Sequence, residues 1–377
     1  MNIAVFNVKF SNNVGDGVVA ETTEYLLSSL ASESNVSTFD LGGRNGYGDT
    51  GLKAPSIFKK AVHTGLKSLP AWLSTRLRQR ATYMLLKKDA IPRWREEIKK
   101  ADRIVIGGGH LISDVELYFP VRLHAIIKLA VEYKKPVYIH AVGVSNPKYF
   151  SAIGKKLFVD VFKDNPYIRY VSVRDELSKK YWCSIFGGAV SVVPDPGNFT
   201  RETYLRYSSI DSSRGVIGVG VKASNDDPKN NKKLVLSVAD YVDLGKCLLD
   251  LGYTPLYFTN GSPEDEVVLC DIKTEFSGSD KVVFAERPLV PEDLVNIVCR
   301  CEKIIAYRLH ACIVATSVGV PVIGLSWGEK LSSYFECIGA SDRICTDFNA
   351  SKIVEQLEKL EPVQIDFSKS SYASLVS

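Results

Sequence analysis

An arginine and a histidine, Arg308 and His310, stand at the start of the otherwise apolar stretch YRLHACIVATSVGVPVIGLSW. The preceding run KIIAY is typical of a buried strand, and a helical pattern begins at Leu309, so both side chains fall where a strand ends and a helix starts. The helix dipole and the first helical N–H groups favour an anion there. Arginine adds a planar fork for carboxylate or phosphate, and histidine can move a proton near neutral pH. The alternative is local: Arg308 pairs with a neighbouring carboxylate and His310 is a core histidine.

A second arginine, Arg174, occupies the equivalent position in the first half of the chain. The apolar run 170–173 predicts a strand that ends at Arg174, and the helix after it opens with Asp175 and Glu176. If the strand ends of two domains face each other across a cleft, Arg174 can contact the same anion from the opposite wall. An ion pair with Asp175 or Glu176 explains it equally well.

Two glycine-containing turns also follow predicted strands. Gly107, Gly108 and Gly109 come directly after RIVI, where the lack of side chains lets backbone N–H groups approach a ligand. The turn SNNVGDG joins the first strand to a helix and contains Asn13 and Asp16, of which Asp16 either caps the helix or binds a hydroxyl. Neither turn has the GxGxxG or GxxxxGK[ST] pattern, so NAD and ATP sites are not indicated.

Other kinds of chemistry find little support. His63, His124 and His140 stand singly without metal-ligand spacing, and no serine lies in a GxSxG elbow. The eight cysteines show no CxxC pair and are expected to be reduced core residues of a cytoplasmic protein. MNIAVFNVKF is typical of a first strand rather than a signal peptide, and no apolar run is long enough for a membrane span. No metal or cofactor is expected.

Strand-like and helical patterns alternate along the chain, which predicts an α/β protein of two Rossmann-like domains. A polar passage over 194–214 places the boundary, giving domains at 1–197 and 198–377. The predicted strands are 3–8, 103–106, 137–141, 170–173, 192–193, one from Gly215, 255–259, 281–285, 303–307, 321–326 and 343–345. The predicted helices are 17–30, 93–100, 118–133, 151–162, 176–182, 238–251, 264–276, 291–301, 309–317, 330–338 and 351–360.

Positive charge is concentrated in one segment. The net charge is +4, yet the segment from Lys53 to Lys100 contains 13 Lys or Arg and three acids, a net +10. Six apolar residues interleave with its cations, namely Leu66, Leu69, Trp72, Leu73, Leu77 and Leu85. This pattern is typical of a peripheral surface for anionic lipid, and equally of a solvated helical insertion. The segment has no nucleic-acid-binding module, so nucleic acid is not expected as a partner.

The motifs NVGDG, IVIGGGHLISD, VSVRDELS, VVPDPG and, most specifically, RLHACIVATSVGVPVIG followed by Lys330 together resemble the polysaccharide pyruvyl transferase family over about residues 3–340. The resemblance implies a fold like that of the GT-B glycosyltransferases. It also implies transfer of the pyruvyl group of phosphoenolpyruvate to two hydroxyls of a sugar in a cell-surface polysaccharide or its precursor. The products are a pyruvate ketal and phosphate.

The resemblance also assigns roles. Arg308 and His310 match the family's essential RLH motif, Arg174 matches its SVRD arginine, and Asp16 and the turn 107–109 match its N-domain turns. Further substrate contacts are expected from Asn13, Leu309 and Lys330. The first domain, with a basic insertion at about 44–100, is expected to face the saccharide acceptor, for which a lipid-linked form is one option, and the second domain is expected to bind phosphoenolpyruvate. The alternatives are a nucleotide-sugar glycosyltransferase and a non-catalytic sugar- or anion-binding module.

Overall fold

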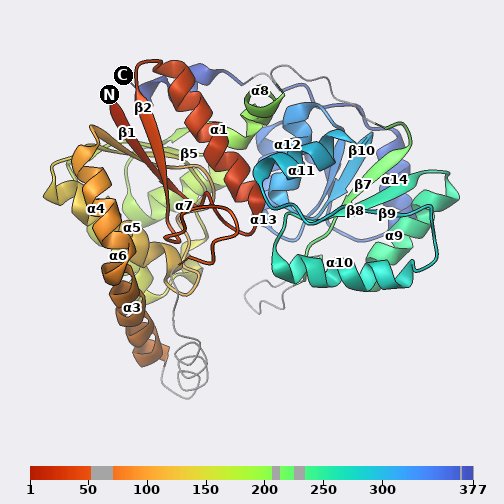
Figure 1. The fold of residues 1–377 in the computed structure, drawn as a ribbon, viewed down its shortest axis with the longest axis horizontal. Helices are drawn as coiled ribbons and strands as arrows, with labels where there is room; N and C mark the ends of the chain where they lie inside the picture. Colours follow the sequence, from red (N-terminus) through yellow and green to blue (C-terminus); the bar gives the residue numbers. More distant parts are fainter. Residues whose placement is uncertain (52–70, 206–212, 225–233, 366, 377) are drawn as a thin grey trace. The chain divides into compact units, whose positions relative to one another are not determined.

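The chain forms two compact α/β units (Figure 1). The computed structural model describes residues 1–51, 71–205, 213–224, 234–365 and 367–376. Unit 1 comprises Met1–Phe10, Thr23–Asp195 and Lys369–Ser377, and unit 2 comprises Ser11–Thr22 and Pro196–Ser368. The main division between Asp195 and Pro196 lies two residues before the predicted boundary. No local pattern in the sequence indicates that Ser11–Thr22 joins the second unit or that Lys369–Ser377 returns to the first.

Unit 1 is built on a six-stranded parallel sheet in the order β2-β1-β3-β4-β5-β6. Its strands are β1 (Asn2–Asn7), β2 (Asn35–Asp40), β3 (Arg103–Gly107), β4 (Val137–Val142), β5 (Ile168–Val173) and β6 (Ser191–Val192). Its helices are the later part of α1 (Val14–Leu30), with α3 (Ala71–Lys88), α4 (Ala90–Lys100), α5 (Tyr118–Glu132), α6 (Ala152–Phe162) and α7 (Glu176–Phe186). Strand β2 lies on one side of β1 and strands β3 to β6 lie on the other, so the strand order reverses between β1 and β3.

Unit 2 repeats this design, with the order β12-β11-β10-β7-β8-β9 and parallel pairing throughout. Its strands are β7 (Val216–Gly220), β8 (Thr254–Phe258), β9 (Val283–Phe284), β10 (Lys303–Ala306), β11 (Val322–Leu325) and β12 (Ile344–Cys345). Its helices are α8 (Thr200–Tyr204), α9 (Val238–Asp250), α10 (Pro263–Glu275), α11 (Pro291–Cys299), α12 (Leu309–Val318), α13 (Glu329–Cys337) and α14 (Ala350–Glu358). The direction reverses between β7 and β10, and α/β sheets bind ligands outside such a point.

Every predicted strand and helix has a counterpart, with bounds that shift by a few residues. Three elements were missed: β2, α3 and the short helix α8, which lies in the polar passage 194–214. The strand β2 reads NVSTFD, too polar for a buried strand, because it lies at the edge of its sheet. The helix α3 lies in the basic insertion at about 44–100, and its many cations obscure the apolar period.

Buried apolar side chains cover both faces of each sheet. In unit 1 they come from strands and helices alike, for example Phe6, Ile106 and Trp94. In unit 2 two clusters flank the sheet, one around Leu256 and one around Tyr257. The expectation that all the cysteines lie in the core is wrong for three of them, since Cys183, Cys270 and Cys337 are exposed. Over the described ranges, no helix is both long and apolar enough to span a bilayer.

The C-terminal segment joins unit 1 through a tyrosine in its interior. Tyr372 is fully buried, and its hydroxyl donates to the carbonyl oxygen of Pro194 at 2.8 Å. Its ring also meets the ring of His140 on β4 edge-on, with centroids 4.3 Å apart. Burial of an aromatic side chain of this size explains why the segment returns to the first unit.

Candidate functional site

Two cations meet where the sheet of unit 2 reverses direction. The strand β7 leads into Lys222, and β10 leads into Arg308. Because Gly220 pairs with Ala306 at the ends of these neighbouring strands, both cations leave the sheet at the same edge. Arg308 is also the N-cap residue of α12, with extended backbone angles (φ −107°, ψ 125°), so it stands directly before the helix start.

The Arg308 guanidinium is held by a buried carboxylate. Its Nε atom donates to Oδ2 of Asp265 at 2.7 Å, and its Nη2 atom donates to Oδ1 at 2.6 Å. Asp265 is fully buried in the first turn of α10 and also accepts the backbone N–H of Ala223 at 2.9 Å. Burial raises the pKa of Asp265, while Arg308 and the Ala223 N–H oppose that shift. The ion pair foreseen as the local alternative for Arg308 is therefore present, and Nη1 makes no hydrogen bond with a described residue.

Lys222 lies between two aromatic rings beside this ion pair. Its Nζ atom is 4.8 Å from the ring centroid of Trp327 and 5.2 Å from that of Tyr307, and it donates to the carbonyl oxygen of Ala223 at 3.0 Å. Burial, and next the charge of Arg308, lower the pKa of Lys222 to about 8. Lys222 therefore stands close to the Arg308–Asp265 ion pair, and both cations would attract an anion bound at this strand end.

His310 faces Asp16 across the start of α12. The His310 Nδ1 atom lies 3.4 Å from Oδ1 of Asp16, and the two side chains are 12% and 27% exposed. Gly15 makes this approach possible, because a Cβ atom there would overlap Cβ of His310 and lie 2.9 Å from its Cγ atom. A carboxylate at Nδ1 orients the ring, favours a hydrogen on Nδ1 and directs Nε2 away from Asp16.

The segment that carries Asp16 is tied to unit 2 by its backbone. The N–H of Val14 donates to the carbonyl oxygen of Asn260, just after β8, at 2.8 Å. A Cβ atom on Gly261, whose φ is +91°, would lie 2.7 Å from the carbonyl oxygen of Asn12, so glycine is required for this approach. These contacts place the start of α1 in unit 2 and bring Asp16 to His310.

Three predicted contact residues surround this cluster. Leu309 is 8% exposed and packs in the core, so it can offer a ligand only its backbone N–H. Lys330, near the start of α13, has its Nζ atom 6.0 Å from the Trp327 ring centroid. The backbone N–H of Asn13 donates to Oγ of Ser11 at 3.2 Å, and its Oδ1 atom is buried without a hydrogen-bond partner.

Arg174 lies in unit 1, in a buried polar cluster. Its side chain is 5% exposed, with Nη1 3.2 Å from Oδ2 of Asp195 and Nε 3.4 Å from Oδ2 of Asp175. Asp175 is in addition the N-cap residue of α7, where it accepts the N–H of Ser178 at 2.6 Å. The local alternative foreseen for Arg174 is thus present. Two carboxylates compensate its charge, so its role as a substrate contact stays a prediction.

Arg174 also fixes the tautomer of His110. Its Nη2 atom lies 3.4 Å from Nδ1 of His110, and His110 Nε2 lies 2.7 Å from Oγ of Ser145. A guanidinium can only donate, so Nδ1 must accept, and in the neutral ring Nε2 carries the hydrogen and donates to Ser145. His110 therefore cannot act as the base for Ser145.

The glycine triplet 107–109 packs closely against β4, and this packing requires glycine at its first position. A Cβ atom on Gly107 would lie 2.7 Å from the carbonyl oxygen of His140, and the N–H of Gly108 donates to that same oxygen at 3.0 Å. Gly108 and Gly109 have φ values of +68° and +81°, a conformation that favours glycine. The expectation that the triplet opens its amides to a ligand is wrong for Gly108, whose N–H is occupied.

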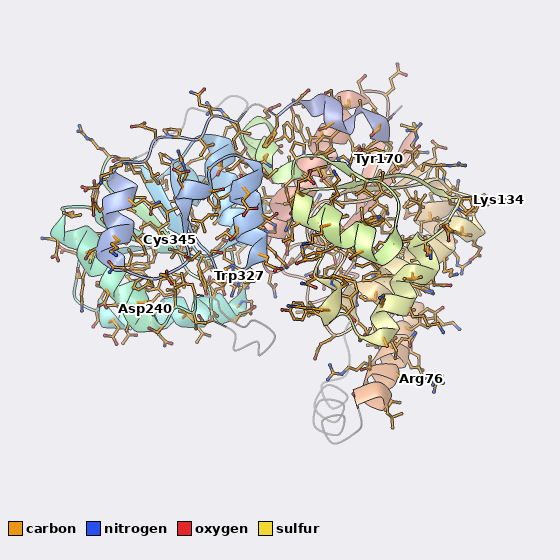
Figure 2. The ribbon with its side chains drawn as sticks, turned by 180° about the vertical axis from the view of Figure 1, so that it is seen from behind. Arg76, Lys134, Tyr170, Asp240, Trp327 and Cys345 are labelled. Carbon is orange, nitrogen blue, oxygen red and sulfur yellow. The ribbon has the colours of Figure 1, made fainter. Side chains whose placement is uncertain are left out.

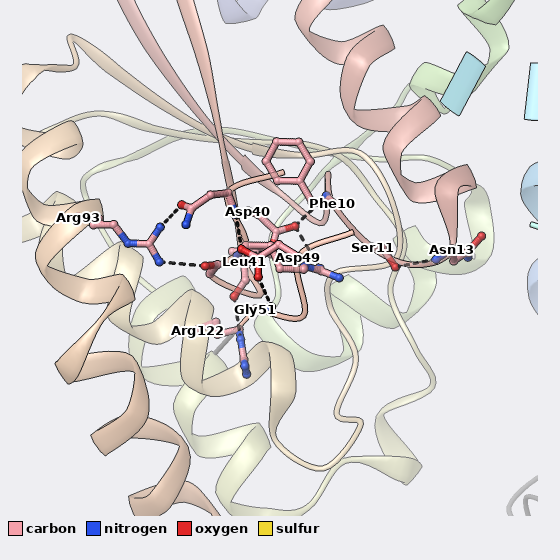
Figure 3. A network of polar contacts seen from close by, with 12 residues as sticks. Phe10, Ser11, Asn13, Asp40, Leu41, Asp49, Gly51, Arg93 and Arg122 are labelled. Atoms are coloured by element: carbon pink, nitrogen blue, oxygen red, sulfur yellow. Dashed lines mark hydrogen bonds and ion pairs between the residues drawn. The ribbon is translucent and has the colours of Figure 1, made fainter. Parts of the chain in front are cut away.

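The loop after β2 is held by a polar network at the carboxyl edge of the unit 1 sheet (Figure 3). Asp40, at the end of β2, accepts the N–H of Phe10 at 3.0 Å and pairs with Arg44 at 2.9 Å. Arg93 donates to the carbonyl oxygen of Gly43 at 2.9 Å, and Arg122 donates to the carbonyl oxygen of Leu41 at 2.8 Å. A cavity of about 610 Å³ adjoins this loop. It is lined by Phe10, Thr38, Phe39, Asp40, Gly43, Arg44, Asn45, Pro92, Arg93, Trp94, Glu96 and Glu97.

Sequence reasoning missed Lys222, Asp265 and Trp327. Lys222 follows the run GVIGVGV directly, so the rule that identified Arg174 and Arg308 at strand ends would have found it. Asp265 reads as an ordinary acid in the first turn of a helix, and nothing in the sequence links it to Arg308. Of the histidines set aside, His140 is buried on β4, His124 pairs with Asp160 at 2.9 Å, and His63 lies outside the described residues.

Solved structures with a similar fold are sugar-nucleotide enzymes of low sequence identity. UDP-GlcNAc 2-epimerase from Methanocaldococcus jannaschii matches with a TM-score of 0.57 and 11% identity, covering 100% of this chain and 98% of that one. The same enzyme in complex with UDP-GlcNAc and UDP gives 0.55 and 12%, with the same coverage. The Neisseria meningitidis enzyme bound to UDP-GlcNAc gives 0.52 and 12%, covering 100% and 98%.

These likenesses show the fold, two Rossmann-like units of the GT-B class. Comparison with curated proteins gives no match. A family profile, in contrast, matches residues 13–329, which include Asp16, Arg174, Lys222, Arg308 and His310. The chain belongs to the polysaccharide pyruvyl transferase family.

Proposed function

We propose that this protein transfers the pyruvyl group of phosphoenolpyruvate onto two hydroxyls of a sugar in a cell-surface polysaccharide or its precursor. The observation that carries the proposal is the cluster in unit 2, where Lys222 stands beside the Arg308–Asp265 ion pair and the pair His310–Asp16 lies at the start of the helix that Arg308 caps. Phosphoenolpyruvate brings a carboxylate and a phosphate, and both require cations or helix N-termini.

In this proposal Arg308 and Lys222 bind the donor. Asp265 holds Nε and Nη2 of Arg308, so the guanidinium is pre-positioned and offers Nη1 to an anionic oxygen. Lys222 adds a point charge from the neighbouring strand end. The first-turn N–H groups of α12, including that of Leu309, provide donors that lack intrahelical acceptors.

The chemistry requires balanced proton movements. A proton adds to the methylene carbon of phosphoenolpyruvate, and the positive character at the central carbon allows a sugar oxygen to bond there. The carbon–oxygen bond to phosphate then breaks, and a second sugar oxygen completes the ketal. Two hydroxyl protons are released, one matching the proton gained by carbon and one leaving with phosphate or solvent. His310, oriented by Asp16, is the proposed acid or base for one of these transfers.

For the acceptor we propose the cavity of about 610 Å³ in unit 1. Its lining combines the aromatic rings of Phe10 and Phe39 with the polar groups of Arg44, Asn45 and Arg93. Apolar walls with a few placed hydrogen-bonding groups are typical of small-ligand sites. The Oγ1 atom of Thr38, which also lines the cavity, is buried and has no hydrogen-bond partner in the described part of the chain.

The test combines ligand binding with turnover. Phosphoenolpyruvate is expected to raise the melting temperature of the purified protein, whereas UDP and GDP do not, and phosphate is expected to appear once a suitable glycan is added. Stabilisation by a nucleotide alone would instead favour a nucleotide-sugar glycosyltransferase. Binding of phosphoenolpyruvate with no phosphate release across a panel of glycans would favour a non-catalytic module.

A further inference from the structure

The helix α3 presents one face that is both basic and apolar. Seven residues of that face are exposed, namely Arg76, Leu77, Arg80, Tyr83, Met84, Lys87 and Lys88. Leu77 is 39%, Tyr83 45% and Met84 71% exposed, although apolar side chains of this size are usually buried. At 100° per residue the seven positions fall within an arc of about 140°. On the opposite side, Leu86 is fully buried against the rest of unit 1.

The cations of this face are not compensated by acids among the described residues. The residues Ala71–Lys88 include no acid, and Arg76, Arg80, Lys87 and Lys88 make no ion pair with any residue that the structure describes. On a different side of the same helix, Arg78 pairs with Glu116 at 2.5 Å. The neighbouring helix α4 also differs, because its Lys99 and Lys100 pair with acids on the same helix.

The helix is placed to make contact with a flat surface. Figure 1 shows its N-terminal part extending beyond the other helices of unit 1, and Figure 2 shows the side chain of Arg76 near that end. Leu73, Leu77 and Met84 form a stripe along the helix, with Arg76, Arg80 and Lys87 on one flank and Lys88 on the other. Such a stripe can enter the boundary between lipid headgroups and acyl chains while the cations remain among the headgroups.

We propose that this face of α3 docks on the surface of an anionic lipid bilayer. Charge complementarity accounts for the cations, and the exposed leucine and methionine favour lipid over nucleic acid, whose phosphate backbone is bound by cations without an apolar stripe. Tyr83 suits the same boundary, since its ring is apolar and its hydroxyl is polar. The proposal does not depend on the proposed function. If both hold, the contact would bring the enzyme to acceptors carried on lipid.

The experiment is flotation of the full chain with two kinds of vesicle. One kind is neutral phosphatidylcholine, and the other contains about 30 mol% phosphatidylglycerol, which makes its surface strongly anionic. The protein is expected to float only with the anionic vesicles, and less at high salt. The double variant Arg76→Gln/Arg80→Gln should bind at least about tenfold more weakly, because each cation near the surface contributes a several-fold gain. Leu77→Ser/Met84→Ser should weaken binding too, since it removes the inserted stripe.

The matched control is Lys99→Gln/Lys100→Gln, which removes the same charge from the same basic segment but from side chains already paired on α4. It should float like the unchanged protein. If the two charge variants lose vesicle binding equally, net charge alone explains the binding and the proposal is overturned. No flotation, or flotation insensitive to Leu77→Ser/Met84→Ser, would overturn it as well, as would tighter binding to an RNA or to an acidic protein. All substituted side chains lie on the surface, so unchanged melting temperatures are expected.

Discussion

Arg308 binds Asp265 through two nitrogen atoms, Nε at 2.7 Å and Nη2 at 2.6 Å. The carboxylate is fully buried, and a second cation, Lys222, stands at the adjoining strand end. The arrangement makes Arg308 a fixed part of the protein rather than a mobile surface arginine. It also sets two cations at neighbouring strand ends, which is the physical basis for the predictions about donor binding.

Donor binding should weaken as the pH rises through about 8. The pKa of Lys222 is lowered to that value by burial and by Arg308, opposed by Asp265 and Glu264, so its charge disappears just above neutral pH. Lys222→Met should lower the affinity for phosphoenolpyruvate at pH 7 by about tenfold or more, since a charge-assisted hydrogen bond is lost. Lys222→Arg should keep the affinity at pH 9, because guanidinium stays charged. Calorimetric titration at pH 7 and 9 measures both, and a pH-independent affinity in the unchanged protein would contradict the role.

The same lysine should affect stability in alkaline solution. Its pKa is lower when folded than when unfolded, so between about 8 and 10.5 the unfolded chain binds more protons and the free energy of unfolding rises with pH. Lys222→Met removes this contribution. Urea unfolding at pH 7.5 and 9.5 should therefore show a smaller gain for the variant than for the unchanged protein, and identical gains would contradict the shift.

His310→Ala should abolish most phosphate release while the protein remains folded. General acid–base catalysis typically contributes ~10²- to 10⁴-fold in rate. Asp16→Asn should cost less, about 10- to 100-fold, because it removes the carboxylate charge that faces Nδ1 of the imidazolium, a charged contact worth ~1.5–3 kcal/mol. Steady-state phosphate release with saturating donor measures both. Near-normal turnover in purified His310→Ala would show that another group moves the proton.

Gly15→Ala should disturb the same pair by steric overlap. The added methyl group would meet Cβ and Cγ of His310, and overpacking of this kind costs ~1–3 kcal/mol. We expect a lower melting temperature and a lower kcat. Gly46→Ala is the matched control, because a Cβ atom there would meet nothing within 4 Å and no left-handed backbone is involved. If both variants behave alike, the close approach of Gly15 to His310 has no functional consequence.

His140 should make the protein sensitive to acid. It is fully buried, its Nδ1 atom lies 2.9 Å from Oγ of Ser172, and burial lowers its pKa to about 3. The stability that it contributes is present above pH 6.5 and is lost as the pH falls, by about 3 kcal/mol at pH 4. His140→Leu should reduce the difference between the free energies of unfolding at pH 7 and pH 4. An unchanged difference would show that His140 does not titrate on unfolding in this range.

Much of the fold followed from local patterns. Runs such as KIIAY and VSV predicted strands, and the switch to helical spacing at Leu309 and Glu176 predicted helix starts, both within a few residues of the structure. The strand β2 and the helix α3 escaped because one lies at a sheet edge and the other carries many cations, so neither shows a clear apolar period. Apolar periodicity reports burial, and weakly buried elements show little of it.

The sequence by itself determined that Arg174 and Arg308 end strands and that His310 opens a helix, because strand ends and helix starts depend on neighbouring residues. Only the tertiary structure decided which groups these side chains meet. The strand order places Lys222 beside Arg308, and the first turn of α10 places Asp265 against the guanidinium. The start of α1 belongs to unit 2, so Asp16 faces His310. Such pairings join residues far apart in the chain and depend on how strands order and helices pack, which local sequence does not encode.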